Sequence, residues 1–149
     1  MSEPASISIG CLSIRVLKRQ FEESQDFWDG NWLLVHACCE TETARVVVSG
    51  PILHLGELQS FRRQLSSLHR DLTGEATLDC IEPNLQVTIR AVGSLGHLES
   101  KIELTGNHLL ERHEFREEFD QSYLSDLLAD LRAIFLEFPI RSPRDDAAA

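Results

Sequence analysis

Catalytic and nucleotide-binding motifs are absent from this sequence of 149 residues. It contains no G-x-S-x-G, H-E-x-x-H, C-x-x-C or Walker pattern. The closest approach to a dinucleotide-binding loop, at residues 93–96, lacks the third glycine of G-x-G-x-x-G and precedes a predicted strand. The common hydrolytic, redox and phosphate-binding chemistries thus lack sequence support. We predict a protein that is not an enzyme, uses no cofactor and acts by binding another macromolecule.

Basic residues are scarce, with 14 Lys and Arg against 24 Asp and Glu, so the net charge is −10. Such a field repels nucleic acids and anionic lipid and attracts basic surfaces. The amino terminus lacks the basic and apolar regions of a signal peptide, and no apolar run approaches the roughly 18 residues that span a bilayer. We therefore expect a cytoplasmic protein with a protein partner, and neither nucleic acid nor membrane as a ligand.

Cysteines are few, and each lies in an apolar, strand-like run. A core of this size needs no disulfide, so we predict reduced, inert thiols buried in the core at Cys11, Cys38, Cys39 and Cys80. Adjacent residues of a strand point to opposite faces, which denies Cys38 and Cys39 a shared ligand or a ready disulfide.

The apolar pattern predicts an α+β fold in a single domain, residues 1–141, followed by a mobile tail, 142–149. Residues 7–16 change apolar phase at Gly10, which suggests one strand with a bulge. Asp29–Gly30 suggests a hairpin turn that needs positive φ. Apolar residues at helical spacing lie at 58–72 and 123–138, and we expect these two helices to end at Gly74 and Pro139. We predict one antiparallel sheet covered by two amphipathic helices, in the order βββ-α-ββββ-α; the clearest strands are 31–39, 44–49, 85–91, 98–104 and 115–119.

The segment from Phe21 to Trp32 mixes aromatic and acidic residues in an unusual way. Exposed aromatics can anchor a partner while carboxylates steer a basic surface toward them. The simpler alternative is that the tryptophans cap the core and the acids solvate a loop, and we favour it for Trp32, which lies in an apolar strand. The partner-binding candidates are Glu22, Glu23, Asp26, Phe27, Trp28 and Asp29.

Two other kinds of site are considered. His108, Glu111 and His113, next to Glu114, could meet at a metal only if a turn brings them together, and a polar connection between strands is the simpler interpretation, so no metal is predicted. A small-ligand or regulatory domain would enclose a pocket between sheet and helices, lined by Trp32, His36 and Cys38. Open sheet edges also leave a homo-oligomer possible.

The stretch F-x-x-S-x-D-x-W-D-x-N-W-L-x-V, residues 21–35, resembles the signature of the WapI-type immunity proteins. The sequences E-P-N-L at 82–85 and F-P-I-R at 138–141 fit the same pattern. The resemblance implies a small cytoplasmic protein, encoded beside a polymorphic contact-dependent toxin, that binds and neutralises the toxin domain without a cofactor. With the acidic composition, it suggests a basic toxin domain as the partner.

Overall fold

The computed structural model describes residues 3–142. Residues 143–149, which make up most of the predicted tail, lie outside this range. Ser142 is the last residue described, and its hydroxyl donates a hydrogen bond to the Gln25 carbonyl at 2.5 Å. The elements, in chain order, are β1 Ser6–Ile9, β2 Leu12–Arg19, α1 Phe27–Gly30, β3 Trp32–Glu40, β4 Arg45–His54, α2 Leu55–Asp71, β5 Glu75–Asp79, β6 Leu85–Val92, β7 His97–Leu104, β8 Glu114–Asp120 and α3 Tyr123–Glu137.

The strands form two antiparallel sheets of four strands each, in the orders β1-β2-β3-β4 and β5-β6-β7-β8. The α+β class and the antiparallel pairing are confirmed, whereas the single sheet is wrong. The predicted order βββ-α-ββββ-α also differs, because residues 7–16 contain two strands and the short α1 precedes β3. Each sheet is a meander of sequence neighbours, and each is followed by a long helix. Apolar periodicity identifies strands but does not show which strands pair across an intervening helix, so it could not separate the two sheets.

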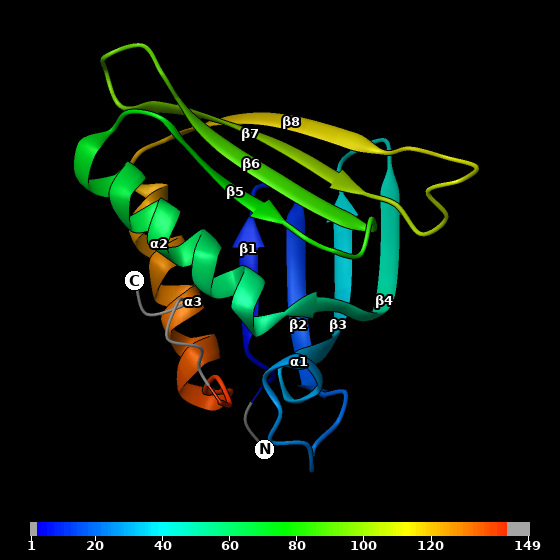
Figure 1. The fold of residues 1–149 in the computed structure, drawn as a ribbon. Helices are drawn as coiled ribbons and strands as arrows, with labels where there is room; N and C mark the ends of the chain where they lie inside the picture. Colours follow the sequence, from blue (N-terminus) through cyan, green and yellow to red (C-terminus); the bar gives the residue numbers. More distant parts are fainter. Residues whose placement is uncertain (1–2, 143–149) are drawn as a thin grey trace.

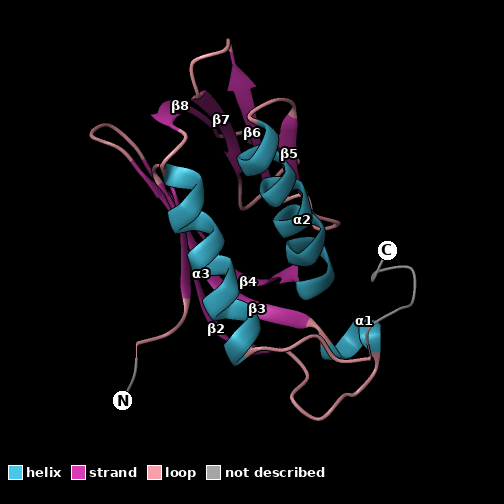
Figure 2. Cartoon of the chain, turned by 90° about the vertical axis from the view of Figure 1, so that its left-hand side faces the viewer, coloured by secondary structure: helices cyan, strands magenta, loops and turns pink. Residues whose placement is uncertain are grey.

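The strands of the two sheets cross steeply, and the two long helices close one side of the space between them (Figure 1). Helix α2 contacts β4, β5 and α3, while α3 also contacts β1. The view in Figure 2 shows α2 and α3 side by side. One core fills this space because each sheet turns a single apolar face inward; its fully buried members include Ile7, Ile14, Leu33, Val35, Phe61, Leu65, Val87, Ile102, Leu127 and Leu131.

Both predicted long helices are confirmed, and each buries its predicted stripe. In α2 the buried residues are spaced three or four positions apart, as on a single helical face. The chain leaves α2 through Leu72 in the left-handed conformation (φ 55°) and Gly74 (φ 85°). Helix α3 ends directly before Phe138 and Pro139. None of the helices in residues 3–142 is long and apolar enough to cross a membrane.

The predicted bulged strand around Gly10 is wrong, because the chain reverses there. Ile9 pairs with Leu12, so Gly10 and Cys11 form a tight turn between β1 and β2. Gly10 has a φ of 55°, and a Cβ at this position would lie 1.5 Å from the Glu117 carboxylate. The backbone conformation therefore favours glycine, and a larger residue would also displace the Glu117 carboxylate from its place beside the turn.

All four cysteines are free thiols. Cys39 and Cys80 are buried, and burial raises the pKa of both thiols. Cys38 lies on the opposite face of β3 from Cys39 and is partly exposed, as strand geometry predicts. Cys11, in the β1–β2 turn, is also partly exposed, so the prediction that every thiol is buried in the core holds for only two of them.

Candidate functional site

Residues 21–30 form a loop that ends in the short helix α1, at the bottom of the molecule in Figure 1. Asp26 caps this helix, because its carboxylate accepts hydrogen bonds from the backbone N–H groups of Trp28 at 3.0 Å and Asp29 at 3.1 Å. A carboxylate at this position satisfies amides that have no partner within the helix. Asp26 therefore shapes the loop.

The predicted hairpin turn at Asp29–Gly30 is wrong, because both residues belong to α1 and Gly30 has no positive φ. Glycine is needed here for a different reason. A Cβ on Gly30 would lie 2.6 Å from the carbonyl oxygen of Ser24, so a larger residue would push the loop backbone away. The residue marks a close approach between two parts of the loop.

Asn31 joins the loop to the C-terminal segment from a fully buried position. Its amide nitrogen donates to the carbonyls of Phe27 at 2.7 Å and Arg141 at 2.9 Å. Its Oδ1 accepts from the backbone N–H of Arg141 at 2.9 Å. Since a buried amide without partners would be costly, these three bonds hold the two segments in one arrangement.

Arg141 holds the loop from the other side. Its Nη1 donates to the carbonyls of Glu22 at 2.7 Å and Ser24 at 2.8 Å, and more weakly to that of Phe21 at 3.4 Å. A single guanidinium thus binds three carbonyls of the first half of the loop. The backbone that carries the predicted acidic residues is fixed by a residue more than a hundred positions away in the sequence.

Arg19 completes this arrangement from inside the core. A bulge in β2 leaves Leu17 51% exposed and turns the Arg19 side chain inward, where it is 5% exposed. The guanidinium donates to the carbonyl of Gly30 at 2.6 Å and to that of Pro139. Burial lowers the pKa of Arg19, and these carbonyls offset the loss of water. We call the following three residues the clasp: Arg19, Asn31 and Arg141.

Four rings pack where the loop meets β3 and β4. His54 lies at the centre, with ring centroids 5.3 Å from Phe27, 5.5 Å from Trp28 and 5.0 Å from Trp32. Phe27 and Trp28 meet edge to face at 5.6 Å. Edge-on arrangements of this kind add to the free energy of burial. Trp32 is only partly buried, on the face of β3 opposite the core residue Leu33, so the expectation that it caps the core is wrong. It packs in the same cluster as Phe27 instead.

His54 also ties the loop to the start of α2. Its Nδ1 accepts a hydrogen bond from the Gly56 N–H at 2.9 Å, so Nε2 carries the proton and donates to the carbonyls of Phe27 at 3.2 Å and Trp28 at 3.1 Å. The backbone N–H of His54 donates to the Glu57 carboxylate at 2.9 Å. Burial raises the pKa of Glu57. The same histidine caps a helix and supports the loop.

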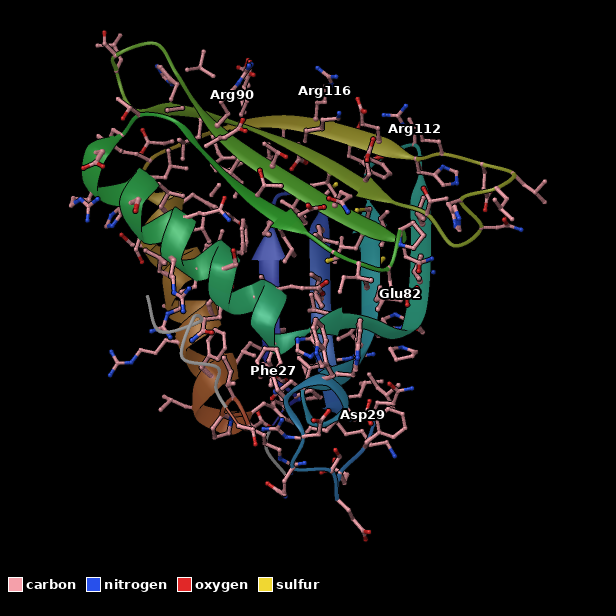
Figure 3. All side chains as sticks on the ribbon, viewed as in Figure 1. Phe27, Asp29, Glu82, Arg90, Arg112 and Arg116 are labelled. Carbon is pink, nitrogen blue, oxygen red and sulfur yellow. The ribbon has the colours of Figure 1, made fainter. Side chains whose placement is uncertain are left out.

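The outer surface of the loop is acidic and aromatic. Glu22, Glu23 and Asp29 are exposed, and none of them forms an ion pair with another residue of the described chain. Phe21 is 45% exposed and Trp28 is 44% exposed. Figure 3 shows Phe27 and Asp29 on α1, below the first sheet. The structure therefore gathers the six predicted residues on one loop, with Asp26 and Phe27 in supporting positions.

The Immunity protein WapI-like family matches residues 5–139. The chain belongs to this family. No curated protein matches the chain. Among solved structures, it is similar to a chain in the crystal structures of MRP1/MRP2 from Trypanosoma bruciei, with 14% identity over 86% of this chain and 76% of that chain and a TM-score of 0.47. That likeness is too weak to support an argument about function.

In the structure, three residues of the signature quoted above have defined local roles. Asp26 caps α1, Asn31 belongs to the clasp and Trp32 packs on His54. Sequence reasoning quoted Arg141 only as part of a helix end and gave no role to Arg19 or His54. Two signals for these residues were present in the sequence. The alternation of inward and outward positions in β2 shifts after Val16. His54 and Glu57 have the H-x-x-E spacing, which resembles a capping box.

The candidate metal residues lie in the β7–β8 connection. The Nε2 of His113 is 3.4 Å from the Glu111 carboxylate, and both residues are partly or largely exposed. Within residues 3–142, no group of three or more His, Cys, Asp or Glu side chains is placed to hold a metal ion. His108 is exposed and does not complete such a group.

The pocket expected between sheet and helices is not built from the predicted residues. His36 and Cys38 lie on the outer face of the first sheet, in a hollow of about 540 Å³ that is open to solvent and is also lined by Arg15 and Arg45. His36 shares a hydrogen bond of 2.7 Å with Ser49 on the neighbouring strand. Trp32 packs in the aromatic cluster instead. These three residues therefore do not line the enclosed pocket that the alternative of a small-ligand domain would require.

Proposed function

We propose that this protein neutralises a toxin by binding its toxin domain, without a chemical step. The loop of residues 21–30 is the contact surface, and the partner presents a basic surface to it. The observation that carries this proposal is the combination on one fixed loop of three exposed carboxylates without ion pairs and two half-exposed aromatic rings. Membership of an immunity protein family supports a toxin as the class of partner.

The clasp gives this loop a physical advantage as a binding surface. Ordering a loop on binding costs free energy, and a loop that is already ordered avoids that cost. The carbonyls of Phe21, Glu22 and Ser24 are held by Arg141, and α1 is capped by Asp26. The carboxylates of Glu22 and Glu23 are therefore presented from a fixed backbone, where they can steer a basic surface, while Trp28 and Phe21 supply apolar contact area.

The test is to coexpress the protein with the toxin encoded by the adjacent gene, and then to measure association and dissociation rates with the purified toxin domain at several salt concentrations. We expect rescue from toxicity and an association rate that falls as salt rises. Glu22→Lys with Glu23→Lys should lower the association rate at low salt by about tenfold or more, and Trp28→Ala should mainly raise the dissociation rate.

A matched control is Glu75→Lys with Glu118→Lys, which changes the net charge equally on the outer face of the second sheet. It should change the association rate far less, because the altered charges lie away from the loop. Equal effects of the two double variants would show that only net charge matters and would remove the loop from the interface. The absence of any complex with the toxin would overturn the proposed function itself.

A further inference from the structure

Two open sheets have four edge strands, here β1, β4, β5 and β8. An edge strand carries a row of backbone N–H and C=O groups that can pair with another chain, and proteins usually cover or charge such edges. The four edges of this protein differ in how far their backbone groups are covered or protected by charge. That difference identifies a surface outside the loop of residues 21–30.

The β1 edge is covered by side chains of α3. The N–H of Ser8 donates to the Asp130 carboxylate at 3.1 Å, and the N–H of Gly10 donates to the Tyr123 hydroxyl at 3.1 Å. The same hydroxyl donates to the carbonyl of Ser8 at 2.6 Å. Donors and acceptors of this edge are therefore already used within the molecule.

The two edges of the second sheet are also protected. On β5, the Gln64 amide of α2 accepts from the N–H of Thr77 at 2.9 Å and donates to its carbonyl at 3.4 Å. On β8, charged residues alternate along the strand and disfavour pairing with another strand. Glu117 of β8 also reaches the β1–β2 turn, where it accepts from the N–H of Cys11 at 2.8 Å.

The direction of the β4 backbone groups follows from the register of β3. The N–H of Glu40 donates to the carbonyl of Cys11 on the β2 side, so the backbone groups of Cys39, the preceding residue, face β4. In the connection between the strands, the N–H of Thr41 donates to the carbonyl of Ala44, in agreement with this phase. The β4 partners of Cys39, Ala37 and Val35 are Val46, Val48 and Gly50. The backbone N–H and C=O groups of these three β4 residues therefore face β3.

The intervening residues of β4 face away from the sheet. Arg45, Val47 and Ser49 direct their N–H and C=O groups to the open edge, and no hydrogen bond from these groups to another segment is found within residues 3–142. Pro51 ends the row because it has no N–H. This edge is also apolar in part, since Val46–Val48 carry no charge and Val47 is 37% exposed.

A hollow of about 450 Å³ lies beside this edge. One wall is β4 from Val47 to Ile52, and the other contains Glu82, Asn84 and Gly106. Figure 3 shows Glu82 beside β4. Glu82 is exposed and forms no ion pair with a described residue, so a basic side chain on an added strand would find an opposite charge there.

We propose that the β4 edge binds an extended segment of the toxin domain as a fifth strand of the first sheet. Backbone groups of Arg45, Val47 and Ser49 pair with that segment, an apolar side chain enters the hollow, and a basic one meets Glu82. The identity of the partner rests on the proposed function. One partner can reach both surfaces, because Ser49 is five residues, or about 17 Å of strand, from His54 beneath Trp28.

The test uses the complex of the full chain with the toxin domain. Amide hydrogen exchange should slow at Val47 and Ser49 on binding, by about tenfold or more. Val47→Pro removes an outward N–H without removing a bond of the β3–β4 ladder, and it should weaken toxin binding by about tenfold or more. Val47→Thr keeps the N–H and a β-branched side chain, and it should bind within about twofold of the unchanged protein.

The other outcomes of this experiment each contradict a different part of the proposal. A complex in which the amides of Val47 and Ser49 exchange as fast as in the free protein would overturn the strand addition and leave toxin binding standing. Slower exchange that depends on the concentration of the free protein would make a second copy the occupant and overturn the toxin assignment. If no complex forms, both proposals fail. If Val47→Pro does not fold, the exchange measurement on the unchanged chain decides.

Discussion

The two connections that carried the candidate sites, residues 20–31 and 105–113, are both polar and both join neighbouring strands, yet they are held in opposite ways. The first is fixed by the buried clasp, whose Asn31 is fully buried and whose Arg19 is 5% exposed. The second is held at its base by Asn84, which donates to the carbonyls of Thr105 at 2.9 Å and Gly106 at 3.1 Å. Beyond that base, its ties lie at the surface.

Surface ion pairs surround the 105–113 connection. Arg112, whose side chain is 70% exposed, binds the carboxylates of Glu103 and Glu114, whose side chains are 29% and 25% exposed. At the tip, Leu109 and Leu110 are 81% and 84% exposed. Exposed ion pairs contribute little to stability, whereas buried polar groups with partners hold a single arrangement. The comparison indicates that the backbone of residues 21–30 is held more firmly than the connection of residues 105–113.

The largest expected effect comes from replacing the asparagine that anchors each of the two connections. Asn31→Ala should lower the free energy of unfolding by about 3 kcal/mol, because it leaves buried groups of the loop and of the C-terminal segment unpaired. Asn84→Ala should cost only about 1 kcal/mol, because the carbonyls that it leaves are closer to solvent. Urea unfolding of both variants measures the difference, and equal costs would contradict it.

A smaller effect on stability is expected from Arg141, together with a specific effect on the loop. Arg141→Ala should cost about 1 kcal/mol and should speed amide exchange in residues 22–29, because three carbonyls of the loop lose their donor. Arg141→Lys should recover little, since a compact ammonium group cannot reach three carbonyls in the same geometry.

The control for Arg141 is Arg132→Ala, which removes an exposed arginine from α3. Exchange in residues 22–29 should not change in this variant. If Arg141→Ala also left the exchange rates unchanged, the loop would be ordered without the clasp, and the contrast between the two connections would lose its physical basis.

The smallest effect is expected in the second connection. Arg112→Ala breaks two ion pairs made by an exposed arginine, and the melting temperature should stay the same within error, because water and salt screen pairs at the surface. Thermal unfolding at low and high salt checks this. A clear loss of stability would mean that this connection is held as firmly as the first.

Local sequence patterns predicted most of the elements but not how they are joined. The spacing of apolar residues predicted α2 and α3 with their buried faces, because a helix must turn one stripe toward the core. The six candidate residues lie on one loop because they are close in sequence, and their role in binding a partner stays a prediction. The phase change at Gly10 was assigned to a bulge, since a bulge and a tight turn shift the apolar alternation in the same way.

The residues that hold the candidate site were mostly missed because their partners are distant in sequence. Arg141 binds carbonyls of Glu22 and Ser24, and Arg19 binds those of Gly30 and Pro139. A carbonyl has no side-chain signature, so no motif can show that it will accept a hydrogen bond from an arginine. For the same reason, the sequence did not indicate that β4 would keep an uncovered edge.

By itself, the sequence determined the α+β class, the two amphipathic helices, the acidic character and the family resemblance, because these depend on composition and on patterns within a few turns or strands. Tertiary structure alone decided that the strands divide into two sheets, that α2 and α3 cover the edges β5 and β1 and leave β4 open, and that a buried clasp fixes the acidic loop. Those outcomes depend on backbone groups, which are the same in every residue and acquire different roles only when the chain folds.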